Sequence, residues 1–492
     1  MEETNELIQL RRQKLETLRH QGIDPFGKRF DVSHSLVQTR GYFVETATEE
    51  SLAETQVVVA GRIMTRRDMG KSAFADIKDG SGRMQIYVQK NTLGEDVYKL
   101  FTDQLDLGDI IGVKGVLFRT KTGEPSIKVS ELTVLSKSLH PLPDKWHGLA
   151  DQEQRSRQRY VDLIVNDDVR TVFRKRSAIV AGIREFLGNR GFMEVETPMM
   201  QSVPGGAAAR PFKTHHNALD LELYMRIAPE LYLKRLLVGG FEKVFELNRN
   251  FRNEGISRKH NPEFTMLEAY WAYADFELMS QLVEEMICHL SLKVNGGLSI
   301  ETKDEAGVVT KTIDLSGPWP RVRYQDAIKK VAGEDWFTLS REQKIAKCRG
   351  WDIEVSDAME DFEVTNQIFE KKVESVTINP VFYTHLPVEL VPLAKQNAED
   401  PSLVDVYELV INGQEISPGY SELNDPIVQR TRLEQQAGEE TQKLDEDFLT
   451  ALSYGMPPAG GIGIGIDRLT ILLTGVESIR DVILFPLLKP KE

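Results

Sequence analysis

Hydrophobic and polar positions divide the chain into a helical start, a β-rich stretch and a longer mixed region. Leucine and isoleucine recur among charged residues over 4–21, which predicts an amphipathic helix. The pattern then changes to five short β-rich runs separated by turn residues, at 57–64, 72–77, 83–88, 109–118 and 131–135. Such a set of short strands favours a small barrel, and the five-stranded oligonucleotide-binding (OB) barrel is one design among several.

The longer region alternates helical and extended patterns. Pro141, Pro143 and the polar residues after them predict a linker before it. Apolar residues at helical spacing predict a helix from about Asp168 to Leu187. An extended run, a glycine-rich loop and another helix follow, at 192–198, at 204–210 and from Pro229 onward. The whole is expected to be α+β with an appended β domain.

Two strands around a long polar turn are predicted between Glu246 and Tyr273. Strand alternation places Glu246, Asn248, Asn250, Arg252 and Glu254 on one face of the first strand. In the second strand, Phe264, Met266, Glu268 and Tyr270 share a face. A soluble sheet does not need such a polar row, so we interpret it as the floor of a polar site. A solvated face with surface ion pairs is the alternative.

Composition and charge exclude several classes of protein. Hydrophobic residues make up 41% of the 492 residues and charged residues 28%, which is typical of a soluble globular protein. No apolar run approaches the about 18 residues of a membrane span, and the charged N-terminus has no signal-peptide core. Cys288 and Cys348 are too few for a disulfide framework or a cysteine zinc site. We expect a cytoplasmic protein, and the net charge of −14 argues against one that mainly coats nucleic acid.

A glycine-rich segment near the C-terminus carries candidate chemistry. Gly461, Gly463 and Gly465 precede Asp467 and Arg468, in a predicted turn that opens an apolar helix. Backbone can approach a ligand closely there, and a helix start favours an anion. No Gly-Lys-Ser/Thr follows, so the segment is not a P-loop. A close packing contact explains the glycines equally well.

Acidic residues on a predicted strand form a second candidate. Glu408 lies between Val406 and Val410 on one strand face, a costly place for a carboxylate without a cation. Glu415 and Glu422 follow at intervals of seven. Magnesium is usually held by one or two carboxylates plus nucleotide phosphates, so Glu408 and Glu415 are a candidate pair. Solvated acidic residues are the alternative. All these features together suggest a nucleotide-dependent ligase with a nucleic-acid module.

The chain resembles the class II aminoacyl-tRNA synthetases over nearly its whole length. FRNEGISRKHNPEFTMLE, GGIGIGIDR and the helix–FMEVETP segment are similar to motifs two, three and one of that family. PGGAAARPF, APELYLKRL, HNPEFTMLEAYWAYAD and GYSELNDP make the chain specifically similar to its lysine-specific members. The resemblance implies an α+β fold, with an antiparallel sheet flanked by helices and an N-terminal five-stranded OB-type barrel.

The resemblance also implies a domain plan and a reaction. The implied parts are an N-terminal helical segment at 1–50, an anticodon-binding OB domain at 51–140, a linker at 141–160 and a catalytic domain at 161–492 with a mostly helical insertion around 277–400. L-Lysine and ATP would give lysyl-adenylate and pyrophosphate, and lysine would pass to the 3′ end of lysine tRNA. Mg²⁺ would be the cofactor. The enzyme would be a homodimer built partly through motif one, without a membrane partner.

For the nucleotide, the resemblance assigns roles residue by residue. Arg252 would hold the lysine carboxylate and the α-phosphate, Arg468 the γ-phosphate, and Phe264 would stack on adenine. The other implied nucleotide contacts are Asn253, Glu254, His260, Asn261 and Gly465. Glu408 and Glu415 would bind magnesium. No general base is needed, because the attacking carboxylate is already ionised at pH 7.

For the amino acid, the resemblance assigns Glu268, Tyr270 and Glu422 to the ε-ammonium. Two carboxylates and a phenol suit its three hydrogen-bond donors. Glu230 and the carbonyl of Gly206 would take the α-amino group. A favourable position on the helix dipole is the alternative for Glu230, which directly follows Pro229.

In the barrel, Phe74 resembles the family's stacking platform for an anticodon base, with Arg67, Gln85 and Glu131 as hydrogen-bonding partners. A core phenylalanine is the alternative for Phe74. Two other functions are open. A ligase that lysylates a protein acceptor would typically lack the barrel. A non-catalytic tRNA-binding paralogue would be expected to lose motif arginines or metal carboxylates, and this chain keeps them.

One position departs from the family pattern. Where many relatives have asparagine before the GYSELND-type segment, this chain has Pro418, which offers neither a side-chain amide nor a backbone N–H. We expect the Pro418→Asn variant to change the KM for lysine more than the KM for ATP, measured by ATP–pyrophosphate exchange. Equal effects on both constants would contradict this expectation.

Overall fold

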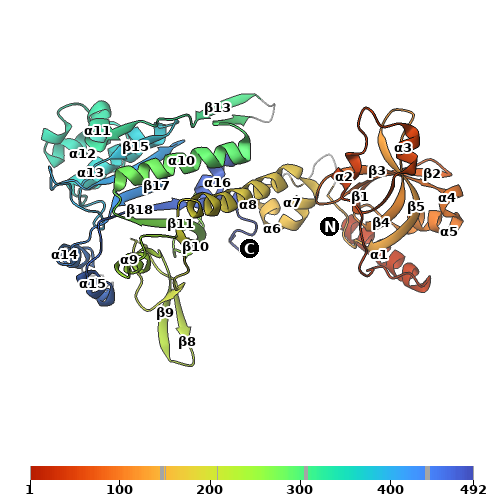
Figure 1. Cartoon of the computed structure of the whole chain (residues 1–492), viewed down its shortest axis with the longest axis horizontal. Coiled ribbons are helices and arrows are strands. Elements are labelled where there is room, and N and C mark those ends of the chain that lie inside the picture. Colours follow the sequence, from red (N-terminus) through yellow and green to blue (C-terminus); the bar gives the residue numbers. More distant parts are fainter. Residues whose placement is uncertain are drawn as a thin grey trace. The chain divides into compact units, whose positions relative to one another are not determined.

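The computed structural model describes residues 2–143, 149, 151–207, 209–303, 308–437 and 444–490. The chain forms two compact units, Met1–Ala150 and Asp151–Glu492 (Figure 1). No helix among these described residues is long and apolar enough to cross a membrane.

The first unit is the predicted barrel with helices around it. Its strands are β1 Gln56–Asp68, β2 Ser72–Lys78, β3 Arg83–Gln89, β4 Ile110–Arg119 and β5 Pro125–Ser136. They close in the order β1-β2-β3-β5-β4, which confirms the five-stranded barrel. Alternate residues such as Ala73, Ala75 and Ile77 fill its interior. The turn at 79–82 joins β2 to β3 as an antiparallel hairpin.

The N-terminal helix is also confirmed, as α1 Glu2–His20. Leu15 and Leu18 on it are buried. Arg11 donates hydrogen bonds to the carbonyls of Leu107, Ser138 and His140. These hydrogen bonds from the Arg11 guanidinium hold α1 against the barrel. The other small helices of this unit are α2 Leu36–Arg40, α3 Glu49–Glu54, α4 Lys90–Leu93, α5 Glu95–Lys99 and the π-helical turn η1 Leu100–Gln104.

The second unit is built on an eight-stranded sheet in the order β14-β15-β16-β17-β18-β11-β10-β6. The strands in that order are Arg321–Arg323, Val381–Thr384, Val406–Ile411, Gln414–Ser421, Ala459–Gly465, Glu263–Ala272, Lys243–Phe251 and Met193–Glu194. The central pairs are antiparallel and the two edge pairs are parallel. The predicted antiparallel sheet is therefore confirmed, with parallel strands at its edges.

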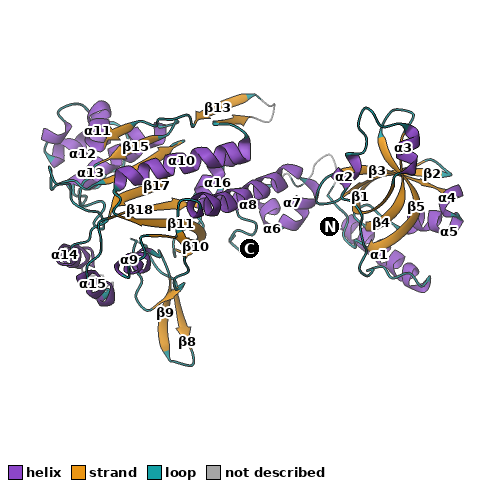
Figure 2. Cartoon of the chain, in the orientation of Figure 1, coloured by secondary structure: helices purple, strands orange, loops and turns teal. Residues whose placement is uncertain are grey.

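Helices cover both faces of this sheet (Figure 2). α8 Asp167–Gly188, α10 Phe276–Asn295 and α16 Ile466–Thr474 pack on one face, over a core that contains Leu247 and Leu267. α9 Glu230–Val238 and α15 Glu446–Ser453 pack on the other face, over a core that contains Tyr270. Because successive strand residues point to opposite faces, β11 supplies both cores.

The remaining elements surround the sheet. They are α6 Gln152–Arg157, α7 Arg159–Val165, β7 Met200–Gln201, β8 Lys213–His216, β9 Leu221–Met225, β12 Ser299–Lys303, β13 Val309–Asp314, α11 Tyr324–Ala332, η2 Trp336–Thr338, α12 Arg341–Gly350, α13 Asp361–Ile368, η3 Phe369–Val373, η4 Glu374–Val376, α14 Pro426–Ala437 and α17 Ile479–Val482. α11, α12 and α13 share a separate apolar core with β15 and β16. The predicted linker lies partly outside the described residues, and its described end carries α6.

Three local predictions are wrong in their details. The glycine-rich segment forms strand β18 rather than a turn, because it pairs with β11 on one side and β17 on the other. The helix expected from Pro229 begins at Glu230, and Pro229 is its N-cap. The extended run at 192–198 contributes only Met193–Glu194 to the sheet.

Candidate active site

The predicted hairpin exists, and its register defines the two faces. Leu247 lies opposite Leu267 on the core side, and Glu246 lies opposite Glu268 on the other side. The predicted polar floor contains one structural ion pair. Arg226 Nη1 lies 2.5 Å from Glu246 Oε1, and both side chains are almost fully buried. Glu246 therefore holds the hairpin to the segment after β9.

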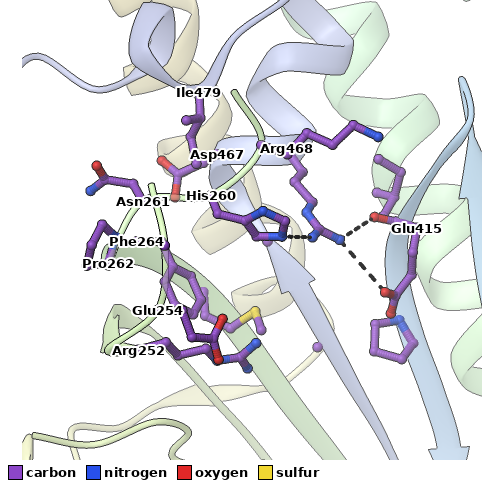
Figure 3. Close-up of a pocket in the computed structure, with 17 residues that line it drawn as sticks. Arg252, Glu254, His260, Asn261, Pro262, Phe264, Glu415, Asp467, Arg468 and Ile479 are labelled. Carbon is purple, nitrogen blue, oxygen red and sulfur yellow. Dashed lines mark hydrogen bonds and ion pairs between the residues drawn. The ribbon is translucent and has the colours of Figure 1, made fainter. Parts of the chain in front are cut away.

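Beside this floor lies a cavity of about 230 Å³, built from the hairpin, β17, β18 and the start of α16 (Figure 3). The predicted residues that line it are Arg252, Glu254, His260, Asn261, Phe264, Glu415, Gly465 and Arg468. Pro418 lines it too, so the position that departs from the family pattern faces this cavity. Asn253 does not line it, and its backbone N–H donates to the carbonyl of Arg210.

Arg252 and Phe264 form one wall of the cavity. The Arg252 guanidinium lies 5.1 Å from the centre of the Phe264 ring. Burial lowers the pKa of Arg252, since taking a cation out of water costs free energy. Among the described residues, Arg252 Nε is buried without a hydrogen-bond partner. The wall thus offers an aromatic face and an unused cationic donor to a flat, anionic ligand.

Arg468 crosses the opposite side of the cavity. Its Nη1 donates to the backbone carbonyl of Glu415 at 3.0 Å, and its Nη2 lies 3.4 Å from His260 Nε2 (Figure 3). Burial, followed by the charge of Arg468, lowers the pKa of His260. The imidazole is therefore neutral at pH 7, and Arg468 remains the cation here.

Asp467, the neighbour of Arg468, fixes the start of α16. Its buried carboxylate accepts a hydrogen bond from the Thr265 backbone N–H at 2.8 Å. It also pairs with Arg176 Nη1 of α8 at 2.7 Å. One side chain therefore joins α16, α8 and β11 next to the cavity.

Glu408 and Glu415 lie on the neighbouring strands β16 and β17. Burial raises the pKa of Glu408 well above its usual range, and the carboxylates of Glu415 and Glu374 raise it further. No described residue offers a salt bridge or hydrogen bond to the Glu408 carboxylate. A divalent cation would relieve this repulsion, so the pair fits Mg²⁺. Among the described residues, no group of three or more histidine, cysteine or acidic side chains is arranged to hold a metal ion.

A second, buried cluster lies on β11, on α9 and at the residue that follows β17. It holds the predicted residues Glu230, Glu268, Tyr270 and Glu422, all 5% exposed or less. Tyr270 Oη donates to Glu268 Oε2 at 3.0 Å. Gly206 lies against Glu230, with φ at +84°, and a Cβ there would lie 3.0 Å from Glu230 Cβ.

Sequence analysis missed two members of this cluster, Lys234 and Tyr420. Lys234 Nζ lies 2.7 Å from Glu230 Oε1 and 2.5 Å from Glu422 Oε2. Tyr420 Oη donates to Glu230 Oε2 at 3.0 Å. The i, i+4 spacing of Glu230 and Lys234 on a predicted helix was the available signal.

The cluster strongly perturbs its acids. Burial, followed by the charge of Glu230, raises the pKa of Glu268 to about 8. Burial also raises the pKa of Glu422, and the ammonium of Lys234 opposes that rise. These carboxyls therefore favour a bound cation over an empty pocket.

Glycines of β18 make room for this cluster. In the sheet register, Gly461 lies opposite Tyr270 on β11 and opposite Tyr420 on β17. A Cβ at Gly461 would lie 1.9 Å from Glu422 Oε1 and 2.7 Å from the Tyr270 ring. The close packing contact, considered as the alternative for these glycines, is therefore present at Gly461.

The barrel carries an aromatic surface where the stacking platform was expected. Phe74 is half-buried on the outer face of β2, so it is not a core residue. Its ring stacks on Tyr87, which the sequence analysis missed, with ring centres 4.6 Å apart. Arg67 lies opposite Phe74 on β1 and is exposed.

The other two predicted barrel residues already have partners. Gln85 is 8% exposed and accepts a hydrogen bond from the Ser126 hydroxyl at 2.8 Å. Glu131 is exposed and pairs with Lys114 at 2.9 Å. Arg67 and Phe74 are therefore the more available pair on this surface.

Comparisons with known proteins match both units. The family described as tRNA synthetases class II (D, K and N) matches residues 151–489, and the OB-fold nucleic acid binding domain matches residues 57–135. The chain is 54% identical to the lysine–tRNA ligase of Pelotomaculum thermopropionicum, over all of this chain and 96% of that protein. It is 53% identical to the ligase of Carboxydothermus hydrogenoformans, over 100% and 99% of the two chains. It is 50% identical to that of Staphylococcus saprophyticus, over the full length of both.

Glu268 allows a test that needs no ligand. Folding raises its pKa from 4.5 to about 8, so between these values the folded protein holds a proton that the unfolded chain releases. The free energy of unfolding should therefore fall as the pH rises from about 5 to about 8. We expect the Glu268→Gln variant to show a smaller decline, measured by urea unfolding. Glu342→Gln, at an exposed acid, should keep the wild-type slope. Equal slopes for Glu268→Gln and wild type would show that Glu268 titrates normally.

Proposed function

Because the chain belongs to the class II aminoacyl-tRNA synthetases, as a lysine–tRNA ligase that activates L-lysine with ATP and charges tRNA, we propose that the cavity and the enclosed acidic cluster form its active site. The observation that carries this proposal is their adjacency. Phe264 and Glu268 lie four residues apart on the same face of β11. Phe264 lines the cavity, and Glu268 belongs to the cluster. A nucleotide and an amino acid can thus meet at one strand.

In the first step, a lysine carboxylate oxygen attacks the α-phosphorus of ATP. A C–O–P linkage forms, the bond from the α-phosphorus to the bridging oxygen breaks, and pyrophosphate leaves. The free donor of Arg252 holds the carboxylate and the α-phosphate, and it stabilises the charge that develops at phosphorus. The Phe264 ring stacks on adenine. The attacking group needs no base, since it is ionised at pH 7.

Arg468 holds the γ-phosphate. Its contacts with the Glu415 carbonyl and with His260 fix the guanidinium, and the Glu415 carboxylate lies 3.8 Å from its Nη1 as a loose ion pair. A magnesium ion held by Glu408 and Glu415 would screen the charge of the phosphates when bound. Glu254 and Asn261 complete the nucleotide cavity, together with the backbone of Gly465. Asn253 is left outside this set, because it does not line the cavity.

The enclosed cluster selects the amino acid. Glu268, Tyr270 and Glu422 accept the ε-ammonium, and Glu230 with the Gly206 carbonyl takes the α-amino group. An amino acid with a neutral side chain would leave buried carboxylates unpaired, which costs free energy and so gives specificity. In the second step a ribose hydroxyl at the tRNA 3′ end attacks the lysyl carbonyl, and AMP leaves.

The barrel binds the anticodon through the Phe74–Tyr87 surface. Stacking of a base on such a platform is worth about 1–3 kcal/mol. Arg67 next to Phe74 adds a cationic donor for phosphate or base edges. Gln85 and Glu131 would have to exchange their present partners to contact a base. The presence of this barrel disfavours a protein acceptor, and the complete set of motif residues disfavours a non-catalytic paralogue.

A homodimer is part of the proposal. A groove between α8 and the segment that follows α17 is lined by Phe173, Val180, Phe485 and Leu487. Phe485 is 69% exposed and Leu487 is 56% exposed. Apolar side chains exposed in one groove mark an association surface, and α8 belongs to the segment that resembles motif one. A cytoplasmic location follows from the reaction, whose product supplies translation.

Amino-acid-dependent ATP–pyrophosphate exchange tests the assignment. We expect exchange with lysine and none of comparable rate with the other standard amino acids. Arg252→Ala should lower kcat by about 10²–10³-fold, as expected for loss of a donor that stabilises transition-state charge. Absence of exchange with lysine, or a stronger signal with aspartate or asparagine, would overturn the proposal.

The barrel surface has a separate test. Phe74→Ala should lower kcat/KM for tRNA charging by about 5- to 150-fold, the equivalent of one lost stacking contact, and leave lysine-dependent exchange unchanged. Phe26→Ala, at an exposed ring elsewhere in the same unit, is the control and should charge tRNA normally. An unchanged kcat/KM in Phe74→Ala would remove this surface from the tRNA site.

A further inference from the structure

Lys234 is a fully buried cation inside a pocket proposed to bind cations. Its side chain has no exposed surface, and its ammonium contacts two carboxylates, Glu230 on α9 and Glu422 directly after β17. The same ammonium lies 5.7 Å from the centre of the Tyr420 ring. A buried lysine costs much free energy unless it is paired, so this arrangement requires both acids.

The two partners of Lys234 differ: both oxygens of Glu230 accept hydrogen bonds, from Lys234 and Tyr420, whereas Glu422 has one oxygen left over. Glu422 Oε2 meets Lys234, whereas Glu422 Oε1 is buried without a hydrogen-bond partner among the described residues. That free oxygen lies on the side of Gly461, where no Cβ intervenes. Lys234 therefore orients the Glu422 carboxylate, with one oxygen held and the other available.

The charges of the cluster match one amino acid. The cluster holds three carboxylates, from Glu230, Glu268 and Glu422, and Lys234 supplies one positive charge from α9. Two negative charges remain for the two ammonium groups of L-lysine, and Arg252 remains for its carboxylate. Without Lys234, three carboxylates would meet two ammonium groups, and one buried acid would stay unpaired or protonated.

Resting on the proposed function, we propose that Lys234 is a positioning residue for the lysine pocket. It lowers the cost of ionising Glu422 and fixes the orientation of both Glu230 and Glu422, so that the pocket presents two negative charges to a substrate with two ammonium groups. The charged and titratable groups around it are Glu230 on α9, Tyr420 on β17, Glu422 directly after β17, and Glu268 and Tyr270 on β11. Arg226 and Arg252 act on Glu268 from farther away.

The test uses the full chain with Lys234→Met, Lys234→Gln and Lys234→Arg. The KM values for lysine and ATP are measured by ATP–pyrophosphate exchange between about pH 6.5 and pH 9, and folding is checked by thermal melting. Glutamine can still donate to both carboxylates, so it is the neutral variant expected to fold. Lys344→Met is the matched control, because Lys344 is also a buried lysine, paired with Asp361 away from the pocket.

We expect either neutral variant to raise the KM for lysine by about 30-fold or more, the loss typical of truncating one partner of a buried charge pair. The KM for ATP should stay within about twofold, and the increase in the lysine KM should shrink as the pH rises and the carboxyls ionise without help. Lys234→Arg should restore the wild-type pH profile. Lys344→Met should lower the melting temperature and change neither constant.

A folded neutral variant with the wild-type lysine KM and pH profile would overturn the inference and make Lys234 a purely structural tie between α9 and the residue that follows β17. Equal increases in both KM values would also overturn it, because the defect would then not be specific to the amino acid. These outcomes are distinct from failure of the proposed function, in which the unmodified chain itself shows no exchange with lysine.

Discussion

The proposed active site depends on one steric constraint, which is that β18 presents glycine where it passes between β11 and β17. Gly461 lies opposite a tyrosine on each neighbouring strand, and Gly463 lies opposite Glu268. Any side chain at Gly461 would occupy the space of the Glu422 carboxylate. The sheet can therefore bury acidic and phenolic side chains from both neighbours in one enclosed cluster. The nucleotide cavity opens further along the same strand, at Gly465.

Burying acids in this way costs electrostatic free energy, and nearby cations compensate that cost to different degrees. Arg226 and Glu246 neutralise each other beneath the hairpin. Lys234 compensates the acids of the amino-acid pocket only in part, so a net negative charge remains there. At Glu408, no described cation compensates the carboxylate at all. Compensation of the buried acids is thus full at the structural ion pair, partial at the proposed substrate site and absent at the proposed metal site.

Elements with strong local periodicity were predictable from the sequence. The barrel strands, α8 and the hairpin follow from alternation and helical spacing, because their burial pattern repeats over many residues. β18 was not, since glycine has a low strand propensity and only the neighbouring strands make an extended conformation favourable there. The candidate site could be predicted residue by residue only through its resemblance to a family. Lys234 was not predicted, because its role depends on Glu422, which is far away in the sequence. Asn253 was predicted as a nucleotide contact, but it does not line the cavity.

Asp467 gives the molecule a further property. The same carboxylate holds the start of α16 beside Arg468, the backbone of β11 at Thr265, and Arg176 on α8. Arg176 also lines the apolar groove at which a second copy is proposed to associate. Fixing α8 in a dimer would therefore also restrict the start of α16, where Arg468 is proposed to bind the nucleotide. Less conformational entropy would then remain to be lost when the nucleotide binds. Subunit association and preorganisation of the phosphate site would then be a single ordering event.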